Sequence, residues 1–536
     1  MKNKKGFFYN ALLLTAVTLL IRTVGVWFNI YVSGKVGAEA MGLLSLVSGV
    51  YNFAVTLATS GIHLATVRIF AERLQKTHGA ENRQCLRACL AYAAFFGTLS
   101  TMLLFSSSGV IGNILLKEPR SIRPLRTLAF TLLPLALSSV FNGYFTAMRR
   151  AYKNAAASVI EQGIKISLTG YLLVIVSPKT VEGSILAVLL GGAVAEALTL
   201  FLNIILYLHD RRLFKKIKQQ KNAHLPSIKS IALPVAISAY MRSGLLAIEH
   251  ILIPRGLIKH GAGNSAALAS YGALQGMALP VVLYPAAILS SFSALLIPEI
   301  TAEHQSGNKR EISYIIGRVY QTALLFSVGV SGVMLFLCGE LGEVLYQSAE
   351  VGKLIGALAP LVPIMYLDTA TDAILKGMGE QVFSMNINIV DALISVFLVW
   401  LLVPHLGIYG YLLTIYISEI FNTACSICRL ISISGFQPRV LTLLFRPIAV
   451  MLLTALASRF IFLKVLPVTA FSANTLTLHI FVFSLIYVLI LIFTKTLPGK
   501  DVSWISQTLF GKRNTKKEQS LCKSAPKKGF FARLKP

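Results

Sequence analysis

Apolar runs of about twenty residues follow one another along almost the whole chain, from residue 8 to residue 495. A run of that length can cross the hydrocarbon core of a bilayer as a helix, and a helix satisfies its own backbone hydrogen bonds there. Charged residues make up only 13% of the chain, against about 25% in soluble domains. We therefore expect an all-α polytopic membrane protein with about fourteen transmembrane helices. The expected segments are residues 8–32, 40–70, 86–108, 125–148, 154–177, 183–208, 230–254, 268–298, 312–337, 356–378, 382–403, 408–432, 441–465 and 474–495.

Basic residues are concentrated in alternate short loops and in the C-terminal tail. The loop 209–221 (HDRRLFKKIKQQK) is the most basic of these loops, whereas the loop 339–350 (GELGEVLYQSAE) is acidic. Cytoplasmic loops of membrane proteins carry such an excess of Lys and Arg. The pattern predicts a multi-pass protein of the cell membrane with both termini in the cytoplasm. It also accounts for the net charge of +28 without a nucleic acid as partner.

The chain contains an internal repeat. A lone arginine, Arg22, lies in the first apolar segment, and another, Arg242, lies in the seventh, 220 residues later. The same offset of 220 residues relates Lys35 to Arg255. Glu161 and Asp391, on an offset of 230, take equivalent places in the fifth and eleventh segments. Because six helices separate the two halves, both start on the same side, so we expect two pseudo-symmetric lobes related by an axis along the membrane normal.

The repeat sets the expected domain organisation. An N-terminal lobe of six helices covers residues 1–208, and a basic cytoplasmic linker covers 209–229. A C-terminal lobe of six helices follows at 230–433. Helices 13 and 14, at 434–498, have no partner in the repeat, and a basic cytoplasmic tail ends the chain at 499–536.

Charged side chains inside the apolar segments are the candidate functional residues. A guanidinium at bilayer depth normally faces a polar cavity rather than lipid, and neither Arg22 nor Arg242 has a carboxylate three or four residues away. Arginine offers a planar fork of donors for phosphate, so we expect a cationic cavity that takes an anion. The candidate substrate ligands are Arg22, Arg242, Arg255 and Lys165, and the candidate coupling-ion or cavity acids are Glu249, Asp391, Glu161 and Asp368.

Ion pairing within a helix is the alternative for some of these charges. Glu161 and Lys165 lie four residues apart and share a helix face, as do Asp372 and Lys376. Such pairs could hold helices together instead of binding a ligand. Cys425 and Cys428 form a CxxC without further ligands, and a metal site needs about four, so no metal site is expected.

Several segments resemble the stage V sporulation protein B group, in the polysaccharide-export branch of the MOP superfamily that also contains lipid II flippases and MATE exporters. The resemblance is carried by YGALQGMALPVVLYPAAILSSFSALLIPEITAEHQ at 271–305, by SGIHLATVRIFAE at 60–72 and by the GMGEQ segment within 375–420. It implies a V-shaped transporter with alternating access, a groove for a lipid tail formed by helices 13 and 14, and a polyprenyl-diphosphate-linked saccharide such as lipid II as substrate. A cavity arginine in helix 1 of that family is similar to Arg22.

The resemblance and the charges together predict a flippase for a lipid-linked oligosaccharide of the cell wall, with a role in spore cortex synthesis implied by the family alone. No enzyme activity and no cofactor are expected, and coupling to Na⁺ or H⁺ is left open. The expected partners are the substrate lipid, the bilayer and cell-wall synthesis enzymes, with a monomer sufficient for the fold. A MATE-like exporter of cationic drugs is the first alternative, and a membrane glycosyltransferase or ligase is the second.

Overall fold

The computed structural model describes residues 3–76, 83–175, 180–213, 228–307, 309–436, 445–464 and 472–494. Within these ranges all regular elements are helices, which confirms the expected all-α class. The N-terminal half contains α1 (Asn3–Thr59), α2 (Ile62–Lys76), α3 (Arg83–Val110), the π-helical η1 (Ile111–Leu115), η2 (Pro119–Ser121), α4 (Ile122–Ala129), α5 (Leu132–Ala147), α6 (Ala151–Ile175) and α7 (Val181–Leu213). The C-terminal half contains α8 (Ile228–Lys259), α9 (Asn264–Gly272), η3 (Ala273–Ala278), α10 (Leu279–Leu283), α11 (Ala286–Ser306), α12 (Lys309–Phe336), α13 (Cys338–Tyr346), α14 (Ala349–Leu358), η4 (Ala359–Leu361), α15 (Val362–Gly377), α16 (Gln381–Leu406), α17 (Ile408–Ser434), α18 (Arg446–Lys464) and α19 (Ala473–Phe493).

Each of the fourteen expected segments overlaps a helix. By length and composition, 11 helices of the described residues could cross a membrane, or 12 if a bent pair at Pro119–Ala147 counts as one span. One of them, Ala16–Glu72, contains 57 residues, which at 1.5 Å per residue is about 85 Å and far exceeds a hydrocarbon core of about 30 Å. It therefore holds two crossings, which separate at Gly37, where the backbone is non-helical with φ 82°. The remaining difference is α18, which is not among the candidate spans.

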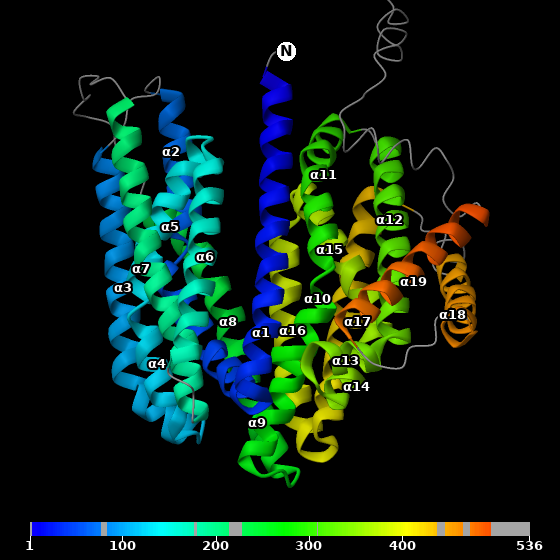
Figure 1. Ribbon diagram of the computed structural model, residues 1–536. Coiled ribbons are helices and arrows are strands. Elements are labelled where there is room, and N and C mark those ends of the chain that lie inside the picture. Colours follow the sequence, from blue (N-terminus) through cyan, green and yellow to red (C-terminus); the bar gives the residue numbers. More distant parts are fainter. Residues whose placement is uncertain are drawn as a thin grey trace, which may run out of the picture.

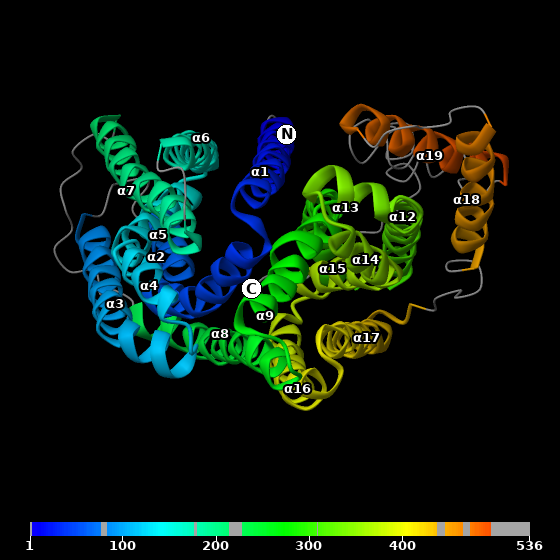
Figure 2. The same ribbon diagram turned by 60° about the horizontal axis from the view of Figure 1, so that its bottom comes forward.

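The helices form two lobes with two extra helices on one flank (Figure 1). The N-terminal lobe is built from α1–α7 and the C-terminal lobe from α8–α17. The part of α1 before Gly37 stands between the two bundles, while α18 and α19 lie on the side of the C-terminal lobe that is farthest from the N-terminal lobe (Figure 2). This arrangement is the pair of six-helix lobes and two additional helices that the repeat predicts.

The repeat can be followed at the ends of individual helices. The fourth crossing of each lobe ends in α5 (Leu132–Ala147) and α15 (Val362–Gly377), and the offset that relates Glu161 to Asp391 also relates the first and last residues of these two helices. The turn after each of them uses a left-handed backbone, at Arg149 with φ 56° and at Gly379 with φ 85°. The two lobes therefore share local backbone conformation as well as helix order.

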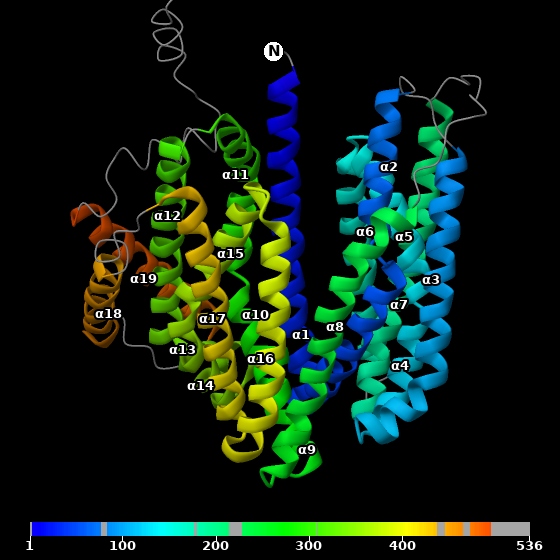
Figure 3. The ribbon, with the colours of Figure 1, turned by 180° about the vertical axis from the view of Figure 1, so that it is seen from behind.

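The lobes meet at the end of the molecule opposite the N-terminus, where α8, α9 and the part of α1 after Gly37 converge (Figure 3). Two glycines at equivalent places of the repeat cross there. A Cβ on Gly42 would lie 1.9 Å from the Leu268 carbonyl oxygen, and a Cβ on Gly272 would lie 2.1 Å from the Ala38 carbonyl oxygen. Since Ala38 and Leu268 are equivalent on the same offset, the contact is itself symmetric, and the pseudo-two-fold axis passes through this crossing.

A buried ion cluster joins α6 and α7 at the opposite end of the N-terminal lobe. Asp210 is 1% exposed and pairs with Lys153 and with Arg150, whose Nη1 lies 2.5 Å from Asp210 Oδ1. A buried ion pair stabilises little overall, but removal of one partner leaves an unpaired buried charge. The packing of α6 against α7 therefore depends on Asp210.

We expect Asp210→Asn to lower the free energy of unfolding by about 3–5 kcal/mol, because Lys153 would be left buried without its counter-charge. The measurement is thermal unfolding of the purified protein in detergent. The matched control is Glu72→Gln, which removes the partner of Arg68 in an exposed i,i+4 pair and should cost about 0–1 kcal/mol. Equal losses in the two variants would contradict this role for Asp210.

Candidate functional site

Arg22 lies on the part of α1 that stands between the lobes. It is exposed, and it takes part in no ion pair with the described residues. Its neighbour Thr23 bonds through Oγ1 to the Tyr284 hydroxyl of the C-terminal lobe at 2.9 Å. On another side of α1, a Cβ on Gly25 would lie 3.7 Å from Gln162 Nε2 of the N-terminal lobe. This stretch of α1 therefore touches both lobes.

Arg242 occupies a comparable depth in α8 and is also exposed. The first helix of each lobe ends before a glycine of positive φ, Gly37 at 82° and Gly261 at 110°. Arg22 precedes Gly37 by 15 residues and Arg242 precedes Gly261 by 19, a difference of four residues or about 6 Å of helix. The two arginines thus lie within about one helical turn of equivalent positions.

Two aspartates of the C-terminal lobe lie near Arg242. Asp368 of α15 and Asp391 of α16 both lie within electrostatic range of its guanidinium. Glu419 of α17 interacts with these two aspartates, and the buried Glu249 of α8 interacts with Asp391. The structure thus places Arg242 near two of the four predicted acids, Asp368 and Asp391, and places a third, Glu249, near Asp391.

Polar side chains hold these acids in place. The Asn422 amide donates a hydrogen bond to Asp368 Oδ2 at 3.4 Å. The Ser418 hydroxyl donates one to Asp391 Oδ1. The Ser395 side chain forms a hydrogen bond with Glu249. Asp372, a neighbour of Asp368, pairs instead with Lys376 at 2.5 Å. Among the described residues no group of three acids, histidines or cysteines could hold a metal ion, so these separate carboxylates are better suited to binding protons.

A smaller charged cluster lies in the N-terminal lobe. Glu161 and Lys165 of α6 interact electrostatically with each other and with Glu196 of α7. Glu196 also lies near Tyr51, whose hydroxyl bonds Thr131 Oγ1 at 2.6 Å. Both lobes therefore place one acid on the fifth helix of the repeat and one on the sixth. Lys165 and Arg242 each lie near acids, whereas Arg22 and Arg255 form no ion pair with the described residues.

Arg255 is placed away from the other predicted basic ligands. It follows Arg242 by 13 residues on α8, which is about 20 Å along the helix axis. Its Nη2 donates to the Ile114 carbonyl oxygen in η1 at 2.6 Å. In this conformation Arg255 therefore joins the two lobes at their closed end, and its role as a substrate ligand stays a prediction.

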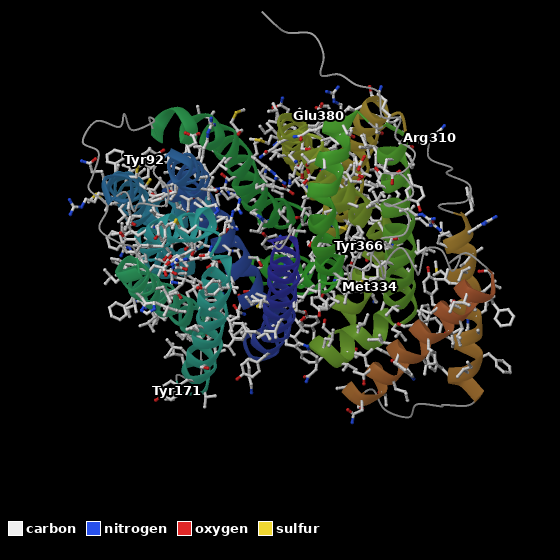
Figure 4. All side chains as sticks on the ribbon, turned by 90° about the horizontal axis from the view of Figure 1, so that it is seen from above. Tyr92, Tyr171, Arg310, Met334, Tyr366 and Glu380 are labelled. Carbon is white, nitrogen blue, oxygen red and sulfur yellow. The ribbon has the colours of Figure 1, made fainter. Side chains whose placement is uncertain are left out.

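An apolar groove of about 560 Å³ lies between α10, α12 and α19. Figure 4 labels Met334, a lining residue, on the part of the C-terminal lobe nearest to α19. Phe483 and Tyr487 of α19 and Phe326 and Val330 of α12 form much of its wall. Gly329 and Gly332 allow α19 to approach α12 closely. A Cβ on Gly329 would lie 2.7 Å from the Tyr487 ring, and a Cβ on Gly332 would lie 3.1 Å from the Phe483 ring. A cavity of this shape and chemistry suits a hydrocarbon chain.

Tyr284 connects the groove to the region of Arg22. It lines the groove, while its hydroxyl bonds Thr23 at 2.9 Å. Sequence reasoning did not find this link, because a tyrosine and a threonine 261 residues apart give no pattern. Tyrosine placed where one end is apolar and the other polar is the only local signal.

Comparison with known proteins agrees with the fold. The family described as polysaccharide biosynthesis protein matches residues 7–303, more than half of the 536 residues. The chain belongs to this family. Among curated members, stage V sporulation protein B of Bacillus subtilis (strain 168) is 25% identical over 447 residues, which covers 80% of this chain and 85% of that protein. Lipid II flippase MurJ of the same organism is 23% identical over 417 residues, with 72% and 75% covered.

Solved structures show the same fold. A lipid II flippase MurJ in an inward closed conformation matches with a TM-score of 0.68 at 12% identity, over 90% of this chain and 99% of that one. An inward-facing MATE multidrug transporter matches with a TM-score of 0.61 at 16% identity, over 79% and 100%. The resemblance to the MOP superfamily seen in residues 271–305 is confirmed, and the protein is a multi-pass membrane protein of that fold.

Proposed function

We propose that this protein is a flippase that moves a polyprenyl-diphosphate-linked saccharide across the cytoplasmic membrane by alternating access, without chemistry on the substrate. Lipid II or a related cell-wall precursor is the substrate class, which the relation to a lipid II flippase supports. Both termini lie in the cytoplasm, as the basic inner loops indicate. The lobes, which touch at the end opposite the N-terminus, are then closed on the outer side.

The observation that carries the proposal is the hydrogen bond between Thr23 and Tyr284. It joins the helix that bears Arg22 to the wall of the apolar groove. A substrate with an anionic diphosphate and a long hydrocarbon tail needs both environments side by side. Arg22 supplies donors to the diphosphate, and the groove between α12 and α19 takes the tail.

The acids around Arg242 provide the driving device in this proposal. Protons bound by Asp368, Asp391 and Glu249 would neutralise carboxylates that otherwise repel one another. Neutralisation changes the charge that Arg242 faces, and with it the preference for one arrangement of the lobes. A charge change at one site can thus be coupled to movement of the substrate at another.

A MATE-like exporter of cationic compounds is the second candidate function. The carboxylates of the C-terminal lobe outnumber its single nearby arginine, and solved MATE transporters share the fold. The two functions predict opposite ligand charge. Binding of undecaprenyl diphosphate supports the flippase, and binding of cationic dyes alone supports the exporter.

We expect Ser484→Trp to weaken binding of undecaprenyl diphosphate about tenfold, or about 1.4 kcal/mol, and to leave farnesyl diphosphate unaffected. Ser484 is exposed and lines the groove, so an indole there would occupy space that the long tail needs. The measurement is equilibrium binding of both compounds to purified protein in detergent.

Leu485→Trp is the matched control, since Leu485 is an exposed neighbour on α19 that does not line the groove. It should bind both compounds as the native protein does. A native protein that binds both diphosphates equally well, or a Ser484→Trp variant indistinguishable from the control, would show that the groove holds no tail.

A further inference from the structure

A row of basic residues lies at the end of the N-terminal lobe opposite the N-terminus. Lys117, Arg120, Arg123 and Arg126 follow one another at intervals of three residues, and the last two share one face of α4. α4, which carries the last two, turns Pro124, Leu125, Leu128 and Ala129 inward. The arginines therefore lie on its outward face, at the lower end of the lobe in Figure 1.

The members of the row differ in their partners. Arg120 is fully engaged, since it contacts Glu118 at 2.6 Å and Glu39 at 2.8 Å. The side chain of Arg123 is 76% exposed, and its Nε lies 3.5 Å from Glu182 Oε1. Arg126 donates from Nε to Ser108 Oγ at 3.0 Å. Among the described residues, the terminal guanidinium nitrogens of Arg123 and Arg126 make no hydrogen bond to the protein.

The surface next to Arg126 is apolar and faces outward. Phe130 is 64% exposed and Met102 is 69% exposed. The Arg126 guanidinium lies 5.5 Å from the centroid of Phe105, and Phe105 packs edge-on against Phe130 at 5.5 Å. Aromatic rings beside arginine are typical of the level where lipid headgroups meet hydrocarbon. A ligand held here would meet both donors and an apolar wall.

The C-terminal lobe offers an internal comparison. Its α14 is the repeat of α4, and the turn before each uses the same left-handed backbone, at Lys117 with φ 54° and at Gln347 with φ 52°. On the offset that relates the two lobes, however, the four basic positions become Gln347, Glu350, Lys353 and Gly356. The fold therefore does not require a basic residue at each of these four positions.

We propose that Arg123 and Arg126 bind the phosphate of an anionic phospholipid in the leaflet opposite the N-terminus. The guanidinium ends contact the phosphate through charge-assisted hydrogen bonds, and the acyl chains lie against Met102, Phe105 and Phe130. The exposed apolar wall favours a bilayer lipid over a soluble anion. Binding at this site holds the N-terminal lobe at a fixed depth while the other lobe moves.

The test is binding of a fluorescent phosphatidylglycerol to the full-length protein in detergent. Arg123→Gln/Arg126→Gln should lower its affinity about tenfold. The matched control is Lys353→Gln/Lys259→Gln, which removes two exposed positive charges at the same end of the molecule and should bind as the native protein does. Arg126→Lys, which keeps the charge, should retain most of the affinity. All four sites are exposed, and elution as a single species in gel filtration confirms that each variant is folded.

Competitors identify the ligand. Unlabelled phosphatidylglycerol should displace the probe, whereas phosphatidylcholine and inorganic pyrophosphate should not. Equal displacement by phosphatidylcholine, or unchanged affinity in the arginine double variant, would overturn the proposal. Stronger displacement by undecaprenyl phosphate would assign the surface to a substrate lipid instead and would also overturn it. Displacement by phosphatidylglycerol and the effect of the arginine substitutions do not depend on whether the protein is a flippase.

Discussion

Arg22→Ala is expected to lower the affinity for undecaprenyl diphosphate by about 1.5–3 kcal/mol, the contribution of hydrogen bonds to a charged group, which is roughly a 10- to 150-fold loss. The reason is that Arg22 is exposed between the lobes and, in the described structure, takes part in no ion pair. Removing it uncovers no buried counter-charge, so the loss reflects the ligand alone. The measurement is equilibrium binding to the purified variant.

The controls separate ligand binding from a general change of charge. Arg310→Ala removes an exposed arginine at the start of α12 (Figure 4) and should leave the affinity unchanged. Arg242→Ala is expected to change both ligand binding and the electrostatics of Asp368 and Asp391, since it removes the positive charge next to these two aspartates. Unchanged affinity in Arg22→Ala would move the diphosphate site away from α1.

Gly42→Ala is expected to abolish transport by preventing closure of the lobes at their present contact. The added Cβ would lie 1.9 Å from the Leu268 carbonyl oxygen, a backbone atom that cannot turn aside. Gly272→Ala should act in the same way because its Cβ would lie 2.1 Å from the Ala38 carbonyl oxygen. To convert a population from 99% closed to 99% open at this end requires about 5.5 kcal/mol, and an overlap of this size can supply it.

Spin labels on Lys117 and Lys353 would report the change, since these residues lie at the same end of different lobes. The distance between the labels, in a background without the six native cysteines, should increase in both glycine variants. The double variant should resemble the single ones, because both act on one contact. Gly170→Ala is the control, as a Cβ there meets nothing within 4 Å. An unchanged distance distribution would show that the crossing is not the closed gate.

The sequence predicted the architecture because its signals are local or periodic. Apolar length located the fourteen segments, and the offset between Glu161 and Asp391 recurs in the ends of α5 and α15. The two-lobe arrangement follows from that repeat. Composition alone does not show the residue at which one crossing ends and the next begins. The expected segments 8–32 and 40–70 therefore left the break somewhere between residues 32 and 40, and the structure places it at Gly37.

The site was predicted less completely, because its contacts join distant parts of the chain. The sequence placed Arg242 and Asp391 in the membrane but could not show that they lie together, since helix packing alone decides it. Arg255 and Arg242 share a helix and a charge, yet about 20 Å of helix separates them. The bond between Thr23 and Tyr284, on which the proposed function depends, has no signature in the sequence.

Flipping of a fluorescent lipid II in proteoliposomes that contain the purified protein decides between a flippase and an exporter. We expect native protein to expose the lipid to a membrane-impermeant quencher far faster than empty liposomes do. We also expect Arg22→Ala and Gly42→Ala to be inactive and Arg310→Ala to be active. Native protein that leaves lipid II in its original leaflet but extrudes a cationic dye would contradict the flippase and support the exporter.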